Sequence, residues 1–135
     1  MSEKIYVISC SEDLKSMGMD RMRTGMEGMG EIVLSLDWSK VRFVPIVAAE
    51  RAHFKEGETK ILSIRSITVP PYAMVIQSFY GVNGMGHATC IGSMKFARPD
   101  SERVADKAMF RSRLDASVLP GDLLGQVFIV PGKKA

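Results

Sequence analysis

The sequence has 135 residues, a mass of 14.9 kDa, 46% apolar residues and 24% charged residues. This length and composition indicate one folded domain spanning residues 1–135, and they exclude a disordered or fibrous chain. The net charge is only +3, which argues against a polybasic nucleic-acid binder. No apolar run reaches ~18 residues, which excludes a membrane-spanning helix. We therefore expect a cytoplasmic protein with no nucleic-acid partner and no membrane insertion.

Short apolar runs, bounded by glycine, proline, asparagine or aspartate, dominate the chain. Such runs are typical of β-strands, and their roughly even spacing favours a β-sandwich or a small β-barrel over an α/β fold. The eight predicted strands cover 5–9, 31–37, 41–48, 60–69, 72–80, 88–97, 107–114 and 123–130. Helix candidates are restricted to 11–29 and 101–109, and in the second we favour a strand that begins near Lys107.

Residues 16–30, which we call the methionine segment, hold five of the ten methionines. On a helix, Met19, Met22, Met26 and Met29 would share one face, because they are spaced by three and four residues. Four glycines interrupt this stretch, and each interior glycine costs up to ~1 kcal/mol of helix stability. A helix here would therefore not support itself.

Three interpretations of the methionine segment stay open. The methionines could pack on the domain's own sheet, as apolar stripes usually do. They could form an adaptable docking surface, because flexible thioethers repack against irregular partners, and oxidation to sulfoxides would then alter the contact. They could bind a soft metal such as Cu(I), although no histidine or cysteine lies among them.

A second unusual segment, residues 80–92, reads YGVNGMGHATCIG. Its glycines lack the spacing of a dinucleotide-binding or phosphate-binding loop, so we predict a wide hairpin whose glycines supply positive φ. Loops on a rigid sheet often carry contact residues. Taken with the methionine segment, this predicts a set of partner-binding residues: Met19, Met22, Met26, Met29, Tyr80, Asn83, Met85 and His87.

Catalytic and metal-binding patterns are absent from the sequence. GxSxG, HExxH and paired-carboxylate motifs do not occur, His53 lies in a charged stretch typical of a solvated loop, and Asp122 fits a turn after Pro-Gly. His87-x-x-Cys90 offers two of the four ligands that a structural zinc needs. We predict no catalytic residue, no metal and no cofactor, and we expect Cys10 and Cys90 to be buried free thiols.

The net positive charge lies entirely in residues 95–113, which hold six bases and three acids. We interpret this stretch as a solvated surface of mixed charge, because a nucleic-acid binder shows a stronger basic cluster with exposed aromatic side chains.

The second half of the chain carries a family resemblance over residues 58–131. The succession ITVPPYAMVIQ, GHATCIG, KAMF and VLPGDLLGQVFIVP resembles the archaeal "domain of unknown function 22" family. Its most specific pieces are PGDLLGQV and the pair His87-Ala88, and the methionine segment lies outside this region. The resemblance implies a cytoplasmic archaeal protein and brings no established activity or catalytic residue.

Two functions are expected from these features. The first is a non-catalytic accessory module that docks onto a larger archaeal complex, such as an oxygen-sensitive, corrinoid-dependent methyltransferase of methanogenesis, because the family is associated with methanogens. The second is a β-barrel that binds a small molecule or nucleotide, either as a binding protein or as an oligomeric enzyme with a weaker likeness to dUTPase-type trimers. The phosphate loop of those trimers is missing, which argues against that enzyme.

Overall fold

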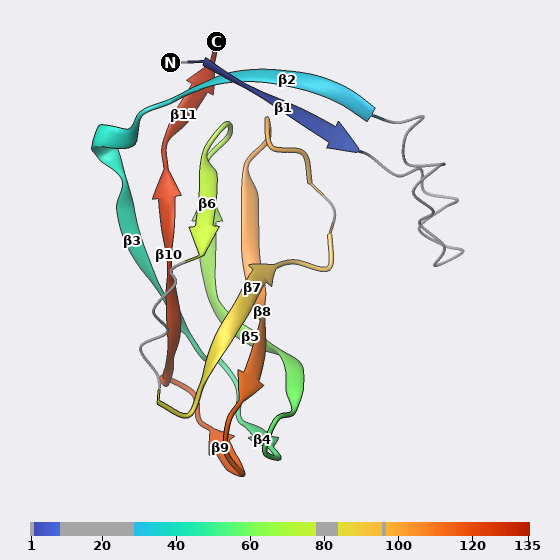
Figure 1. Ribbon diagram of the computed structural model, residues 1–135, viewed down its shortest axis with the longest axis vertical. Coiled ribbons are helices and arrows are strands. Elements are labelled where there is room, and N and C mark those ends of the chain that lie inside the picture. The colour runs from blue at the N-terminus through green and yellow to red at the C-terminus, as the bar shows by residue number, and fades with distance from the viewer. Residues whose placement is uncertain (1, 9–28, 78–83, 96) are drawn as a thin grey trace.

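The structure of the protein is a computed structural model that describes residues 2–8, 29–77, 84–95 and 97–135. Short strands dominate it, and Figure 1 traces them along the chain. Their bounds are β1 Ser2–Ile8, β2 Met29–Leu36, β3 Arg42–Val47, β4 Ala52–Phe54, β5 Thr59–Val69, β6 Met74–Gln77, β7 Gly86–Gly92, β8 Arg103–Ser112, β9 Ala116–Val118, β10 Leu123–Val130 and β11 Gly132–Lys134, with a 3-10 helix η2 at Trp38–Lys40.

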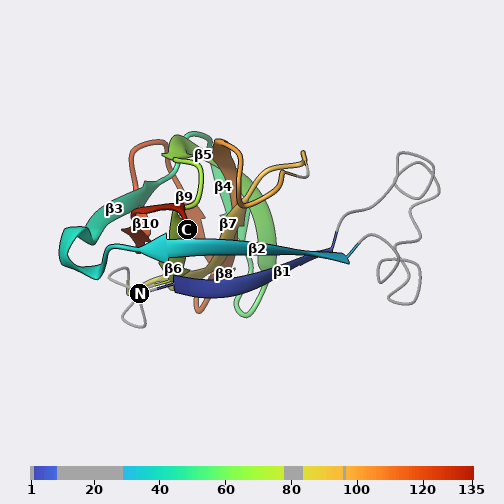
Figure 2. The same ribbon diagram turned by 90° about the horizontal axis from the view of Figure 1, so that it is seen from above.

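The strands form four small antiparallel sheets, with the orders β1-β2-β11, β3-β10-β6, β4-β9 and β5-β8-β7. Sheets β3-β10-β6 and β5-β8-β7 are the two walls of the body, and β1-β2-β11 crosses one end of it (Figures 1 and 2). The prediction of a mostly β domain is confirmed. The barrel alternative is wrong, because no sheet closes on itself within the residues that the structure describes.

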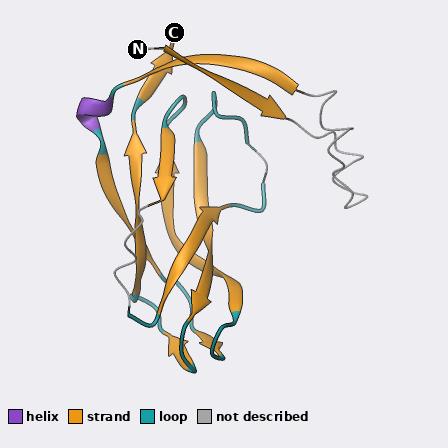
Figure 3. Ribbon diagram, viewed as in Figure 1, coloured by secondary structure: helices purple, strands orange, loops and turns teal. Residues whose placement is uncertain are grey.

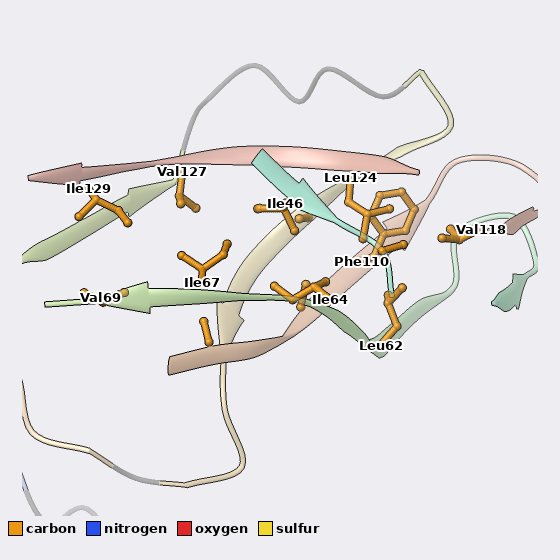
Figure 4. Packing of buried hydrophobic residues seen from close by; sticks show 14 of the residues in the cluster. Ile46, Leu62, Ile64, Ile67, Val69, Phe110, Val118, Leu124, Val127 and Ile129 are labelled. Atoms are coloured by element: carbon orange, nitrogen blue, oxygen red, sulfur yellow. The ribbon is translucent and has the colours of Figure 1, made fainter. Parts of the chain in front are cut away.

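The main core lies between the two walls. Val127 and Ile129 of β10 point toward Ile67 and Val69 of β5 (Figure 4). At the other end of the core, the rings of Phe54 and Phe110 meet edge to face with centroids 5.5 Å apart. Alternate residues of a strand face one side of a sheet, and each fully buried side chain of this size stabilises the fold by roughly 1.5–3 kcal/mol.

A smaller apolar cluster joins the end sheet to the body. Adjacent residues of β10 face opposite ways, so that Ile129 enters the main core while Val130 packs with Ile32, Leu34 and Leu36 of β2. The chain then passes through Pro131 into β11, which pairs with β2. The end sheet therefore packs on one end of the β3-β10-β6 wall, and the continuous segment β10-β11 contributes to both sheets.

Two irregularities break the strict alternation of the strands. Between Ser63 and Ile67 of β5 the register against β8 shifts, which explains the imperfect alternation of 60–69 in the sequence. A second shift lies between Ala88 and Cys90 of β7. Such bulges redirect side chains, and Cys90 is exposed, so the prediction of a buried thiol at Cys90 is wrong.

Several predicted element bounds need correction. β8 runs from Arg103 to Ser112 as a strand, and the helix drawn in purple in Figure 3 is the 3-10 helix η2, so the helix candidate at 101–109 is wrong. Met29 opens strand β2, so it cannot lie on a helical face with Met19, Met22 and Met26. Those three methionines, with Cys10, lie outside the described residues. His53 and His87 lie in strands β4 and β7 rather than in loops.

Candidate functional site

A groove of about 640 Å³ opens where strand β6 of one wall lies beside strand β7 of the other. The two strands belong to different sheets, and the described link between them is a side-chain hydrogen bond, in which Gln77 Nε2 donates to the Ala88 oxygen at 3.1 Å. The walls therefore separate along this side. The volume falls within the roughly 300–1,000 Å³ that is usual for small-molecule sites.

The floor of the groove is apolar and continuous with the main core. Val69 and Ala105 are both buried core residues, and Val75 and Ile91 pack against the same cluster. An apolar ligand body placed here would bury surface at roughly 25 cal/mol per Å². The floor therefore suits a hydrocarbon or ring framework.

Arg103, at the start of β8, supplies a fixed cation in the groove wall. Its Nη2 donates to the Ala73 oxygen at 2.6 Å and to the Pro70 oxygen at 3.2 Å, and its Nε donates to the Ser101 oxygen at 3.3 Å. All three acceptors are neutral carbonyls. Burial lowers the pKa of Arg103, and the nearby charge of Asp100 raises it in part. The guanidinium nevertheless stays protonated, because arginine side chains do not lose their proton in proteins.

Two further charged residues line the groove, Lys95 and Glu102. The backbone nitrogen of Lys95 donates to Ser93 Oγ at 3.1 Å, which tightens the turn after β7 and places Lys95 at the rim. Lys95 and Arg103 carry two positive charges against the single negative charge of Glu102. The acidic and basic residues that line the groove therefore have a formal net charge of +1.

The bulge in β7 brings neutral polar groups to the same groove. Thr89 and Cys90 are both exposed next to the register shift, and both line the groove. Thr89 Oγ1 donates to the Met109 oxygen at 3.2 Å. Because Gln77 is anchored through its nitrogen, its amide oxygen can accept a hydrogen bond from a ligand.

The predicted partner-binding residues do not line this groove. Met85 is half-buried and packs against the main core, while His87 is exposed on β7 opposite Arg111. Met29 lies in β2, and the remaining predicted residues, Met19, Met22, Met26, Tyr80 and Asn83, lie outside the described residues.

Sequence reasoning missed Arg103, Lys95 and Glu102 as site residues. The available signal was the charged stretch 95–113, which was interpreted as a solvated surface. Arg103 meets the carbonyls of residues 70 and 73, about thirty positions earlier in the chain, and such long-range contacts leave no local pattern.

The described part of the chain contains neither a metal-binding cluster nor a membrane-spanning helix. There, no three histidine, cysteine, aspartate or glutamate residues gather as a metal site would require. No helix within the same ranges has the length and apolar character to cross a bilayer. His53 Nδ1 instead lies 3.1 Å from Ser117 Oγ across the β4-β9 pair.

Comparison with known proteins places the chain in a family. The profile described as "Domain of unknown function DUF22" matches residues 20–116. An uncharacterized protein of Methanocaldococcus jannaschii is 33% identical over 96 residues, which cover 71% of this chain and 74% of that protein. No solved structure matches.

The matched range differs from the one assigned by resemblance. It begins at residue 20, so the prediction that the methionine segment lies outside the family region is wrong for most of that segment. It also ends at residue 116, before PGDLLGQV, although the resemblance to the archaeal family itself is confirmed. The chain belongs to the family defined by the domain of unknown function DUF22.

Proposed function

We propose that this protein is a non-catalytic module that binds a small molecule in the groove between β6 and β7. The observation that carries the proposal is the combination of an apolar floor, continuous with the core, and a rim of a few charged and polar groups. This combination is the usual anatomy of a ligand site. We favour binding over catalysis because histidine, the commonest general base, is not among the described residues that line the groove.

The proposal can be tested with a variant that fills the groove. Val104 lines the groove and is 44% exposed, so Val104→Trp adds a large side chain without displacing the core. In a thermal-shift screen of organic acids, nucleotides and neutral metabolites, a ligand at ~100 times its dissociation constant adds about 2.7 kcal/mol to wild-type stability. We expect Val104→Trp to abolish that shift.

Two results of the screen would contradict the proposal. One is that no compound in any class shifts the wild-type protein. The other is an equal shift in wild type and Val104→Trp, which would place binding elsewhere on the molecule.

A second proposal is docking onto a partner protein, and the outer face of sheet β5-β8-β7 supports it. Ile61, Met109 and Cys90 stand in one row across the three strands, and the next row holds Arg111 and His87. Residues directly opposite in antiparallel strands share a face. Ile61 is 58% exposed, and a depression of about 120 Å³ lies beside this row.

The charge of this face selects the kind of partner. Lys107 and Arg111 carry positive charge on either side of the apolar row, and Lys107 Nζ donates to Ser63 Oγ at 2.8 Å rather than to a carboxylate. We propose an acidic protein segment with apolar side chains as the occupant, because its charge complements these bases. A methanogenesis enzyme as the host complex stays a prediction.

The docking proposal is tested with a purified partner. A protein captured from the archaeal host is purified, and its affinity is measured for wild type, Ile61→Glu and the control Leu119→Glu, which changes an apolar residue that is 47% exposed in a turn. We expect Ile61→Glu to weaken binding at least tenfold, added salt to weaken it further, and Leu119→Glu to bind as wild type. Equal affinity for Ile61→Glu and wild type would show that this face is not the interface.

A further inference from the structure

The arrangement of charge in the groove identifies the chemical class of its ligand. We propose that the groove selects an organic anion, a small molecule in which an apolar body carries a carboxylate, phosphate or similar acidic group, and that the acidic group binds Arg103. This inference rests on the proposed small-molecule function and deepens it.

Arg103 is a cation without a carboxylate partner in the described structure. Its three hydrogen bonds go to backbone oxygens, and the described ion pairs involve other residues. The carboxylate whose charge acts on Arg103, that of Asp100, already accepts from Arg98, whose Nε and Nη2 donate to its two oxygens at 3.2 and 3.4 Å. The positive charge of Arg103 is therefore left for a ligand to neutralise.

The guanidinium of Arg103 is also fixed in place. Nε and Nη2 are used by the chain, and no described acceptor takes a hydrogen bond from Nη1. A planar guanidinium held in this way has lost its rotational freedom before any ligand binds, so an acidic group can accept from Nη1 at a small entropic cost. Lys95 adds a second, exposed cation at the rim, and the negative charge of Glu102 offsets one of the two positive charges.

The apolar floor begins beside this cation. Ala105 lies two residues from Arg103 on β8, and both side chains line the groove with Val69 and Val75. A ligand whose acid meets Arg103 therefore places its adjoining atoms on the floor. This geometry favours a molecule with its acid at one end of an apolar framework.

A purely structural role of Arg103 is the alternative. Its contacts with Pro70 and Ala73 hold the turn between β5 and β6, and this clamp requires no ligand. Under that alternative, Arg103 has no preference for anionic ligands, and its loss affects charged and neutral ligands equally.

Two fluorescent probes with the same framework separate these possibilities. 8-Anilinonaphthalene-1-sulfonate carries an acid, whereas N-phenyl-1-naphthylamine is the same framework without charge. We expect the sulfonate to bind wild type about tenfold more tightly or better, since a hydrogen bond to a charged group is worth that factor. Lys95→Gln should weaken binding of the sulfonate probe severalfold, and Arg103→Gln should weaken it about tenfold. Neither substitution should change the affinity for the neutral probe. Val104→Trp should weaken both probes.

Each other outcome has a definite meaning. Equal binding of the two probes to wild type would overturn the anion preference while leaving a neutral small-molecule function intact. Absence of binding, or binding unaffected by Val104→Trp, would overturn the proposed function itself. Equal weakening of both probes by Arg103→Gln would assign Arg103 the structural role. If Arg103→Gln does not fold, the test uses Lys95→Gln and the salt dependence of sulfonate binding instead. The inference would then be overturned if neither Lys95→Gln nor added salt weakened sulfonate binding.

Discussion

At the scale of single residues, glycine is required at position 86, at the start of β7, because no side chain fits there. Access to positive φ is not the reason. A Cβ at this position would lie 2.1 Å from the backbone oxygen of Arg111 and 2.9 Å from Cζ of Phe110. Neither neighbour can move easily, because one is backbone and the other is a fully buried ring. The sequence argument for positive φ is therefore wrong at Gly86, which is absent from the positive-φ glycines of the described chain.

We predict that Gly86→Ala destabilises the protein by about 3 kcal/mol, because the methyl group overpacks this strand junction. Gly84→Ala is the matched control, since a Cβ there meets nothing within 4 Å. Urea unfolding of the two variants measures the difference. Similar unfolding midpoints would show that the chain relaxes around the added methyl group.

The Glu58 carboxylate makes stability depend on pH. The hydrogen bond from the backbone nitrogen of Lys55, at 3.2 Å, lowers its pKa below the ordinary value of 4.5, and Lys60 adds to the shift. A lowered pKa means that the folded state prefers the ionised form. The resulting stabilisation is complete above pH 4.5 and is lost as the pH falls through the lower pKa of the folded state.

We therefore predict that wild type melts at a higher temperature than Glu58→Gln near pH 6, and that the gap narrows as the pH falls below 4.5. Thermal melts of both proteins across this range provide the measurement. A gap that does not change with pH would mean that ionisation of Glu58 contributes nothing to stability.

At the scale of elements, β8 connects the core, the groove and the outer face. It pairs with both β5 and β7, and its residues Ala105 and Ala108 are both buried, so the alternation changes phase between them. Asp106 lies at this phase change, and its Oδ1 is buried without a hydrogen-bond partner in the described structure. An unpaired buried acceptor is costly, so Asp106 is a weak point of the strand.

Asp106→Val is predicted to raise stability by about 1 kcal/mol, because valine has a similar shape, favours strands and has no polar atom to leave unpaired. The control is Asp115→Val, which removes a carboxylate that accepts from the Glu56 nitrogen at 2.6 Å and should lower stability. Unfolding free energies in denaturant test both changes. A loss of stability in Asp106→Val would mean that this carboxylate stabilises the fold.

The strands show how far the sequence predicts this structure. Long strands with clear alternation, such as β10, were predicted within a residue or so, because their pattern reflects a wall with one buried face. β4, β9 and β11 were missed, since three residues are too few to show a period. The groove was missed because it lies between β6 and β7, two strands that do not pair with each other. Strand pairing depends on the topology of the whole chain and leaves no local sequence pattern.

At the scale of the whole molecule, one core holds the two walls together. Phe110 of β8 and Phe54 of β4 are both fully buried within it, whereas Phe43 and Phe128 form a ring pair outside the cluster. The interior of a β-sandwich is close-packed, so removing a central ring leaves a cavity that the walls cannot fill without separating.

Phe110→Ala is accordingly predicted to cost about 3–5 kcal/mol of unfolding free energy, which would leave a domain of this size barely folded. Phe43→Ala changes the same residue type at a site that is 62% exposed and should cost about 1 kcal/mol or less. Circular dichroism during denaturant unfolding compares them. Comparable losses in the two variants would show that the space between the walls is not the main source of stability.

The pairing of the end sheet also makes the fold suitable for circular permutation. Ser2 of β1 and Lys133 of β11 pair with the same residue, Ser35, from its two sides. Neighbouring strands lie about 4.8 Å apart, so these two positions are separated by about 10 Å across β2. A linker of a few residues could join them, and new ends could then be opened in the exposed turn between β8 and β9, on the far side of the body (Figure 1).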